Sequence, residues 1–207
     1  RHFTESGKDP FDKLSWSKRD VEIRNFDGSV AFSMKDVNLP DNYSQVAANV
    51  LAQKYLRKAG IPKKLRKVKE KAVPSWLQRS VPDLKSMENL SEGEKFGEEI
   101  DGKQTFRRLA GTWTYWGWKH GYFASEEDAK AYFDEMCYML ASQMVAPNSP
   151  QWFNTGLNWA YGIEGPAQGH YFVNPKTGEL ERSVNAYEHP QPHACFIQSV
   201  SDDLVNE

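Results

Sequence analysis

The sequence predicts an α+β fold, in which a β-hairpin arm precedes a mainly helical region. Residues 21–32 alternate apolar and polar side chains around an Asp-Gly pair, which is typical of a hairpin. Two longer stretches repeat apolar residues at helical spacing, each behind a capping serine, Ser44 or Ser125. With 207 residues the chain can bury a core, and its abundant aromatic residues offset a mean hydropathy of −0.72.

The expected hairpin pairs residues 21–24 with residues 30–32. Asp27 and Gly28 lie between the two runs, and the glycine supplies the positive φ angle that a tight turn requires. This pattern is structural and indicates no chemistry.

The first helix is expected to begin at Ser44 and to end at Gly60 and Pro62. Its apolar stripe comprises Val46, Ala47, Val50, Leu51, Tyr55 and Leu56. The basic run that follows, residues 63–71, is interpreted as a solvated face, with a patch for phosphate or an acidic subunit as the alternative. Residues 72–102 carry several Pro, Gly and charged residues and predict a surface connection with one short helix.

Residues 106–118 predict a second helix whose aromatic side chains belong mostly to the core. Its shared apolar face comprises Phe106, Leu109, Ala110 and Trp113. Stacking of the tryptophans on a cofactor is the alternative. A third helix begins at Ser125, and its buried stripe comprises Ala129, Tyr132, Phe133, Met136, Leu140 and Met144. Cys137 lies beside that stripe and is interpreted as a small buried hydrophobic residue.

Pro147 ends the third helix, and residues 148–156 predict a polar loop containing aromatic residues. Such a loop can present backbone N–H groups to a phosphate, although Asn-Ser-Pro is also an ordinary turn sequence. Residues 171–173 and 180–184 predict a second hairpin. Residues 193–200 predict a short strand that runs into an acidic segment.

The densest group of reactive side chains comprises His189, His193 and Cys195, with His170 upstream. Three interpretations stay open from the residues alone: a zinc site, structural histidines beside a buried thiol, and a redox or nucleophilic Cys195. The spacing lacks the Cys-x-x-Cys pair of common zinc sites.

Global properties argue against several classes of protein. The formal net charge of −2 gives no general attraction to nucleic acid. No apolar run reaches the roughly 20 residues of a membrane span, and the first residues do not resemble a signal peptide. Two cysteines do not form a secreted disulfide framework, so we expect a reducing, cytoplasmic location.

Residues 144–157, with the order Met-Val-Ala-Pro-Asn-Ser-Pro-Gln-Trp-Phe-Asn-Thr-Gly-Leu, resemble the long vitamin B12-dependent, class II ribonucleotide reductases. Residues 107–118, 168–171 and 187–207 resemble the same enzymes in the same order. The resemblance extends from Arg1 to Glu207 and is least specific over residues 63–103.

The resemblance implies a helical N-terminal region followed by a ten-stranded α/β barrel with a radical-bearing finger loop. Three units are then expected: an arm with its hairpin at 1–42, a helical domain at 43–145, and an incomplete start of the catalytic barrel at 146–207. The strand that starts at Cys195 would be the first barrel strand.

The resemblance also implies roles for individual residues. Cys195 corresponds to the redox cysteine that forms a disulfide with a downstream partner. Ser149 corresponds to a substrate contact, and Ala194 with Cys195 to a second one. Asp202 corresponds to the residue that holds the sugar hydroxyl of an allosteric deoxynucleotide. The resemblance assigns no metal ligand.

The family's chemistry needs a thiyl-forming cysteine, a second redox cysteine and an asparagine–glutamate pair, which this chain does not supply. We therefore expect the chain to be inactive alone, with adenosylcobalamin bound mainly by absent parts of the enzyme. The expected partners are the remainder of the reductase in the same chain or another subunit, a ribonucleotide substrate, a deoxynucleotide effector and a thioredoxin-type reductant. Neither a membrane nor nucleic acid is expected. The alternatives are a non-catalytic nucleotide-sensing or docking module, and a small zinc protein.

Overall fold

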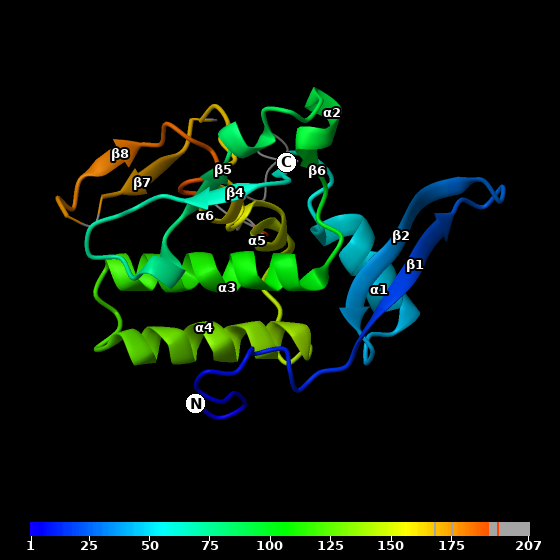
Figure 1. Cartoon of the computed structure of the whole chain (residues 1–207), viewed down its shortest axis with the longest axis horizontal. Coiled ribbons are helices and arrows are strands. Elements are labelled where there is room, and N and C mark those ends of the chain that lie inside the picture. The colour runs from blue at the N-terminus through cyan, green and yellow to red at the C-terminus, as the bar shows by residue number, and fades with distance from the viewer. Residues whose placement is uncertain (168, 175, 191–193, 195–207) are drawn as a thin grey trace, which may run out of the picture.

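The computed structural model describes residues 1–167, 169–174, 176–190 and 194. Two long helices, α3 (Gly102–Lys119) and α4 (Glu126–Ala141), lie side by side, and a β-hairpin extends from one end of the pair (Figure 1). Short two-stranded sheets and helices cover the other side of α3. The predicted α+β class is thus observed as a mixed fold with small separate sheets.

The predicted N-terminal hairpin is confirmed and is longer than expected. Strands β1 (Trp16–Arg24) and β2 (Val30–Pro40) pair antiparallel. Gly28 has a φ angle of +84° in the connecting turn, as the Asp-Gly pair predicts. The end of the hairpin near the helices is anchored by Val37 and Leu39, which are fully buried.

The helix predicted at Ser44 begins there but ends early. The Ser44 side chain caps α1 (Gln45–Val50) by accepting from the Ala47 N–H at 3.1 Å, and the chain continues as the π-helix η1 (Leu51–Tyr55). The predicted stripe was wrong at Val46 and Val50, which are exposed. The buried face instead centres on Ala48, Leu51 and Ala52, because small alanines allow this short helix to approach its neighbours closely.

Residues 61–97 hold more structure than the predicted surface connection with one short helix. Strand β3 (Ile61–Pro62) pairs with β6 (Phe96–Gly97), and β4 (Leu65–Lys67) pairs with β5 (Ser80–Pro82). The short helices of this segment are η2 (Ser75–Leu77), η3 (Lys85–Met87) and α2 (Glu92–Lys95). The prediction failed because single apolar residues, Leu77 and Met87, anchor the segment and give no periodic signal.

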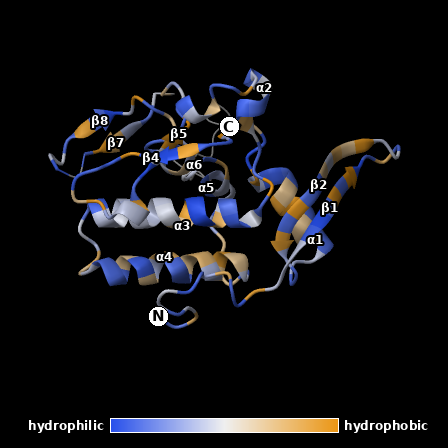
Figure 2. Ribbon diagram, viewed as in Figure 1, coloured by the Kyte–Doolittle hydropathy of each residue, from blue (hydrophilic) through white to orange (hydrophobic). Residues whose placement is uncertain are grey.

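The two long helices confirm their predicted starts and most of their core faces. Figure 2 shows hydrophobic residues gathered toward the C-terminal end of α4. Asp101 caps α3 and Ser125 caps α4. In α3 the predicted face packs in the core, and in α4 Cys137 is completely buried, as expected. Tyr132 and Met144 were wrongly assigned to the core, because both side chains are exposed.

Residues 148–156 are not the predicted loop. They contain α5 (Ser149–Asn154), and α6 (Leu157–Tyr161) follows after Gly156. The Asn148 side chain caps α5 by accepting from the Gln151 N–H at 3.1 Å, a local signal that also fits a turn.

The second predicted hairpin is confirmed as β7 (Tyr171–Val173) paired with β8 (Leu180–Arg182). The strand predicted at 193–200 lies outside the described residues apart from Ala194, and the described part of the chain contains no barrel. In that same part, no helix has both the length and the apolar character to cross a membrane.

Candidate functional site

Among the predicted site residues, Ser149 is the one whose position and hydrogen-bond partner are both described. It is the first residue of α5, its side chain is exposed, and its Oγ shares a 3.2 Å hydrogen bond with the hydroxyl of Tyr55. Tyr55 ends η1, so two segments far apart in the chain meet at this hydroxyl pair.

Aromatic packing fixes the position of α5 against η1. The Tyr55 ring stacks on Trp152, with centroids 5.1 Å apart and planes 19° from parallel. Trp152 is buried, and its indole Nε1 donates to the Pro147 carbonyl at 3.1 Å. The centroid of the Phe153 ring lies 5.6 Å from that of Tyr55. Ser149 therefore lies on a helix that aromatic contacts hold against η1.

A buried guanidinium ties this surface to α3. Arg108 donates from Nη1 to the Thr155 carbonyl at 2.7 Å and from Nη2 to the carbonyls of Trp152 at 2.9 Å and Tyr55 at 3.1 Å. These carbonyls end α5 and η1, where helices leave backbone acceptors unsatisfied. Arg108 thus joins the two segments that carry Ser149 and its partner.

Glu99 neutralises this guanidinium. Arg108 Nε donates to Glu99 Oε1 at 2.8 Å, and neither side chain is exposed. Glu99 also accepts from the Arg57 backbone N–H at 2.8 Å, from Thr105 Oγ1 at 2.9 Å and from the Tyr161 hydroxyl at 2.7 Å. Burial alone would raise the pKa of Glu99, but the charge of Arg108 and these hydrogen bonds hold it below its usual value.

Gly156 allows α5 and α6 to lie directly on α3. Its φ angle is +88°, and a Cβ at this position would lie 2.3 Å from the carbonyl oxygen of Arg108. Any larger residue would therefore have to move backbone, which would displace α5 and Ser149 from the surface of α3.

A hollow of about 350 Å³ lies next to Tyr55. It is lined by Gln53, Lys54, Tyr55, Leu56, Arg57, Lys58, Ala59 and Phe153. Two of its cations are turned to nearby backbone: Lys58 Nζ donates to the Ala52 carbonyl and Arg57 Nε to the Ala59 carbonyl. Lys54 forms no ion pair with any residue that the structure describes, so it adds a positive charge to the hollow.

The other predicted site residues are Ala194, Cys195 and Asp202. Ala194 is exposed, and Cys195 and Asp202 lie outside the described residues. The structure therefore places Ser149 beside Tyr55, and the predicted grouping of Ser149 with Cys195 and Asp202 stays a prediction.

The histidines differ in their surroundings. His189 stacks on Phe172, with centroids 4.1 Å apart. The Nδ1 of His170 is buried and has no hydrogen-bond partner among the described residues, and His193 lies outside them. Across the described residues, no three His, Cys, Asp or Glu side chains form a group that could hold a metal ion.

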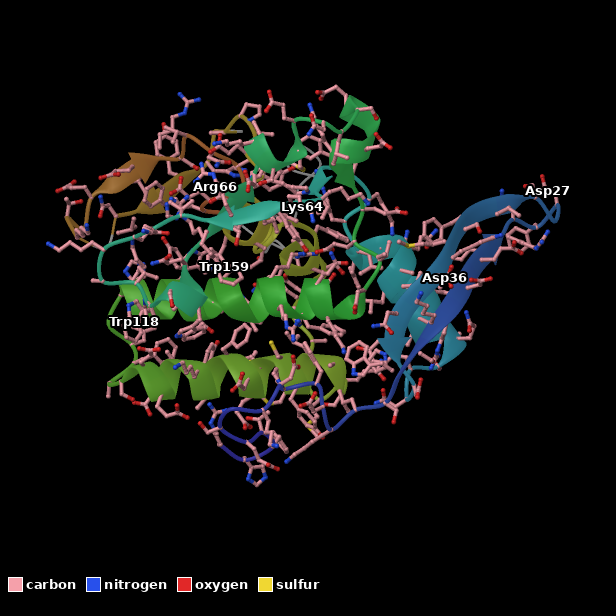
Figure 3. The ribbon with its side chains drawn as sticks, viewed as in Figure 1. Asp27, Asp36, Lys64, Arg66, Trp118 and Trp159 are labelled. Carbon is pink, nitrogen blue, oxygen red and sulfur yellow. The ribbon has the colours of Figure 1, made fainter. Side chains whose placement is uncertain are left out.

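The basic run of residues 63–71 fits its interpretation as a solvated face. Lys64 and Arg66 are exposed on or beside β4, above Trp159 in the view of Figure 3. Lys67 covers part of the protein surface, since its Nζ donates to the Gln78 carbonyl at 2.7 Å and lies 5.4 Å from the Trp159 ring centre. A phosphate or acidic partner for this run stays an untested alternative.

Sequence reasoning missed Arg108, Glu99 and Tyr55 as the support of the site. Glu99 lies in a charged segment that looks like a surface loop. A weak signal existed for Arg108, because Thr105, Arg108 and Thr112 are spaced along one face of the predicted helix. All three side chains are buried.

Comparison with known proteins gives consistent matches along the chain. The family model described as class II vitamin B12-dependent ribonucleotide reductase matches residues 17–143. Proteins named vitamin B12-dependent ribonucleotide reductase from Agrobacterium fabrum and Bradyrhizobium diazoefficiens are 61% and 60% identical over all 207 residues. A protein of the same name from Rhodopirellula baltica is 30% identical over 97% of the chain. The chain spans 16% of the length of each of these three relatives.

Proposed function

Because this chain belongs to the class II vitamin B12-dependent ribonucleotide reductases and corresponds to their N-terminal portion, we propose that it contributes substrate contacts and one redox cysteine to an enzyme that reduces ribonucleotides to deoxyribonucleotides. The observation that carries the proposal is the 61% identity over all 207 residues, a span in which Ser149 and Cys195 both lie. The remainder of the reductase would supply the other catalytic groups.

The proposed role of Cys195 is to supply reducing equivalents. The ribose C2′–OH bond breaks and a C2′–H bond forms, while two cysteine thiols lose their hydrogens and join in a disulfide. One water molecule leaves, so that one ribonucleotide and two thiols give one deoxyribonucleotide, one disulfide and one water. A thioredoxin-type reductant would restore the thiols by disulfide exchange.

Substrate and effector contacts are proposed at three further positions. Ser149 would hydrogen-bond the ribonucleotide, and Ala194 with Cys195 would form a second contact. Asp202 would accept from the sugar hydroxyl of a deoxynucleotide effector. Support for the first contact is geometric: Ser149 is exposed, and its hydroxyl is bonded to Tyr55, which also lines the positively charged hollow.

Adenosylcobalamin, which the family uses to start its radical chemistry, does not fit the described part of the chain. The hollow beside Tyr55 measures about 350 Å³, and a cavity between α3, α6 and the β7–β8 hairpin measures about 860 Å³. Both are within the range for drug-sized ligands, whereas a corrin with its adenosyl and nucleotide groups is much larger. We therefore assign no cobalamin contact to these residues.

The test is cysteine replacement in the complete reductase that contains this segment. Cys195→Ser should abolish cobalamin-dependent turnover with the natural reductant while nucleotide binding persists. The matched control is Cys137→Ala, which removes the buried cysteine and should retain turnover. Retained turnover in Cys195→Ser would exclude the proposed redox role.

The alternative function, a non-catalytic nucleotide-sensing or docking module, predicts a different result. The tagged native protein would then bind a deoxynucleotide or a partner without converting ribonucleotides. Cobalamin-dependent conversion by the purified material would exclude this alternative, whether the remainder of the enzyme is in the same chain or in a co-purifying subunit.

A further inference from the structure

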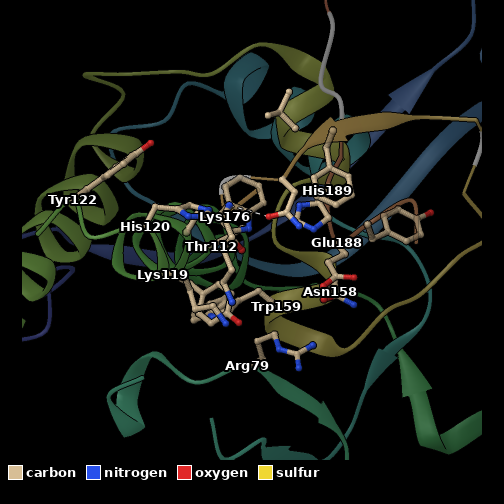
Figure 4. A pocket seen from close by; sticks show the side chains of 16 residues that line it. Arg79, Thr112, Lys119, His120, Tyr122, Asn158, Trp159, Lys176, Glu188 and His189 are labelled. Carbon is tan, nitrogen blue, oxygen red and sulfur yellow. Dashed lines mark hydrogen bonds between the residues drawn. The ribbon is translucent and has the colours of Figure 1, made fainter. Parts of the chain in front are cut away.

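A second cavity, which the proposed function does not use, lies between the C-terminal half of α3, helix α6 and the β7–β8 hairpin. Its volume is about 860 Å³, within the range of small-molecule sites. Figure 4 shows side chains from all three elements around it, including Lys119 and His120 from the end of α3, Trp159 from α6 and Lys176 from the hairpin. Neither Ser149 nor Tyr55 lines it.

Aromatic rings form much of the wall. Tyr115 and Trp116 come from α3, Trp159 from α6, and Phe172 from β7. Two of these rings are held in place: the Tyr115 hydroxyl donates to Glu70 Oε2 at 2.7 Å, and Trp159 Nε1 donates to the Leu77 carbonyl at 3.0 Å. A fixed aromatic wall favours a planar ring in the ligand.

The charge of the cavity is positive. Arg79, Lys119 and Lys176 line it against one carboxylate, Glu188. The Glu70 carboxylate partly neutralises two of these cations: its Oε1 lies 3.0 Å from Arg79 Nε, and its Oε2 lies 3.6 Å from Lys119 Nζ. Lys176 forms no ion pair with any other described residue. Lysine ammonium groups at the edge of an aromatic wall favour an anionic group such as a phosphate.

One polar side chain at the wall can bond to a ligand. Asn158 is available through its Oδ1, since its Nδ2 donates to the Ile163 carbonyl. Thr112 also lines the cavity, but its buried Oγ1 lies against Gly156, 2.9 Å from the position that a Cβ would take there. We therefore assign the polar contact to Asn158.

We propose that this cavity binds a small aromatic anion of the nucleoside monophosphate class. The ring lies against Trp159 and its aromatic neighbours, the phosphate lies between Lys119 and Lys176, and Asn158 Oδ1 accepts a hydrogen bond from the sugar or base. The cavity shares no lining residue with the hollow beside Tyr55 and is not lined by Ser149, so this ligand would occupy a place separate from the proposed substrate contact.

The test is photolabelling of the complete reductase with 8-azidoadenosine 5′-monophosphate, followed by mass spectrometry of the labelled peptides. The label should attach to peptides that contain residues 112–122, 158–159 or 171–189. Excess adenosine monophosphate should protect these peptides, while adenosine alone and phosphate alone should protect them much less, because each lacks half of the recognised group.

The double variant Lys119→Gln and Lys176→Gln should need an at least about tenfold higher probe concentration for half-maximal labelling. The control Lys85→Gln replaces an exposed lysine outside the cavity and should behave as wild type. Labelling that spares the cavity peptides, or that is unchanged in the double variant, would overturn the proposal. Turnover measured on the same preparations tests the proposed function separately, so the two can fail independently.

Discussion

Arg108 and Glu99 form a completely buried ion pair, with Nε and Oε1 2.8 Å apart, beneath the helix that carries Ser149. The pair is surrounded by further donors and acceptors, so each charge is fully hydrogen-bonded. Burying charges is tolerated only under these conditions. We therefore interpret the pair chiefly as a device that holds α5 and η1 in place, and not as a net source of stability.

Removing one member of the pair should be severely destabilising. Arg108→Met leaves the Glu99 carboxylate buried without its counter-charge, which costs about 3–5 kcal/mol in comparable cases. Urea unfolding followed by tryptophan fluorescence would measure the loss. The control Arg107→Met removes a surface ion pair with Asp9 and should change the free energy of unfolding by at most about 1 kcal/mol.

A double variant tests whether the loss comes from the isolated charge. Arg108→Met combined with Glu99→Leu removes both charges, so it should be more stable than Arg108→Met alone. Equal stability of the single and double variants would show that lost packing, and not the unpaired carboxylate, dominates.

The sequence predicted those elements whose signals are local. Ser44 and Ser125 are caps, the Asp-Gly pair is a turn, and Cys137 follows helical spacing, and each of these predictions was confirmed. α5 was missed because Asn148 fits both a turn and a helix cap, and only tertiary contacts with α3 and η1 decide between them.

The buried residues beneath the site, Arg108 and Glu99, were less predictable from the sequence than Ser149. Ser149 was found through resemblance. Glu99 becomes buried only because four donors converge on it, from Arg57, Thr105, Arg108 and Tyr161. A single sequence shows a charged residue among charged neighbours and gives no sign of this convergence. The roles of Cys195 and Asp202 stay predictions, since both lie outside the described residues.

Gly156→Ala should destabilise the chain by more than about 3 kcal/mol. The new Cβ would combine a disfavoured φ angle with a close contact to the Arg108 carbonyl. Gly178→Ala is the matched control, because Gly178 also has a positive φ, +73°, but has open space where the Cβ would lie. It should cost only about 1 kcal/mol. Thermal unfolding of both variants would measure the difference, and equal losses would exclude the steric argument.

Tyr55→Phe should test whether Tyr55 orients the Ser149 hydroxyl, with little effect on the stability of the fold. The substitution keeps the ring that stacks on Trp152 and removes only the hydroxyl bonded to Ser149, a bond worth about 0.5–1.5 kcal/mol. In the complete reductase we expect the KM for the ribonucleotide to rise several-fold with little change in kcat. Tyr132→Phe, on the exposed side of α4, is the control and should leave KM unchanged. An unchanged KM in Tyr55→Phe would argue against Ser149 as a substrate contact.

Glu135 should make stability depend on acid pH, because it holds the N-terminal residues on α4. Its carboxylate accepts from Thr4 Oγ1 at 2.6 Å and from the backbone N–H groups of His2, Phe3 and Thr4. Burial opposes ionisation, but these hydrogen bonds lower the pKa of Glu135 from 4.5 to about 2.

The folded state therefore binds this proton more weakly than the unfolded state does. The contribution of Glu135 is fully present above the unfolded pKa of 4.5 and is lost as the pH falls through about 2. Solvent screening limits it to about 1 kcal/mol. Glu135→Gln should be less stable than wild type above pH 4.5, and the difference in free energy of unfolding should shrink as the pH falls below that value. The control Glu5→Gln, which removes an exposed ion pair with Lys13, should have a smaller effect. A Glu135→Gln difference that stays constant with pH would contradict an anchor that depends on the charge of the carboxylate, because that contribution must disappear once the carboxylate is protonated.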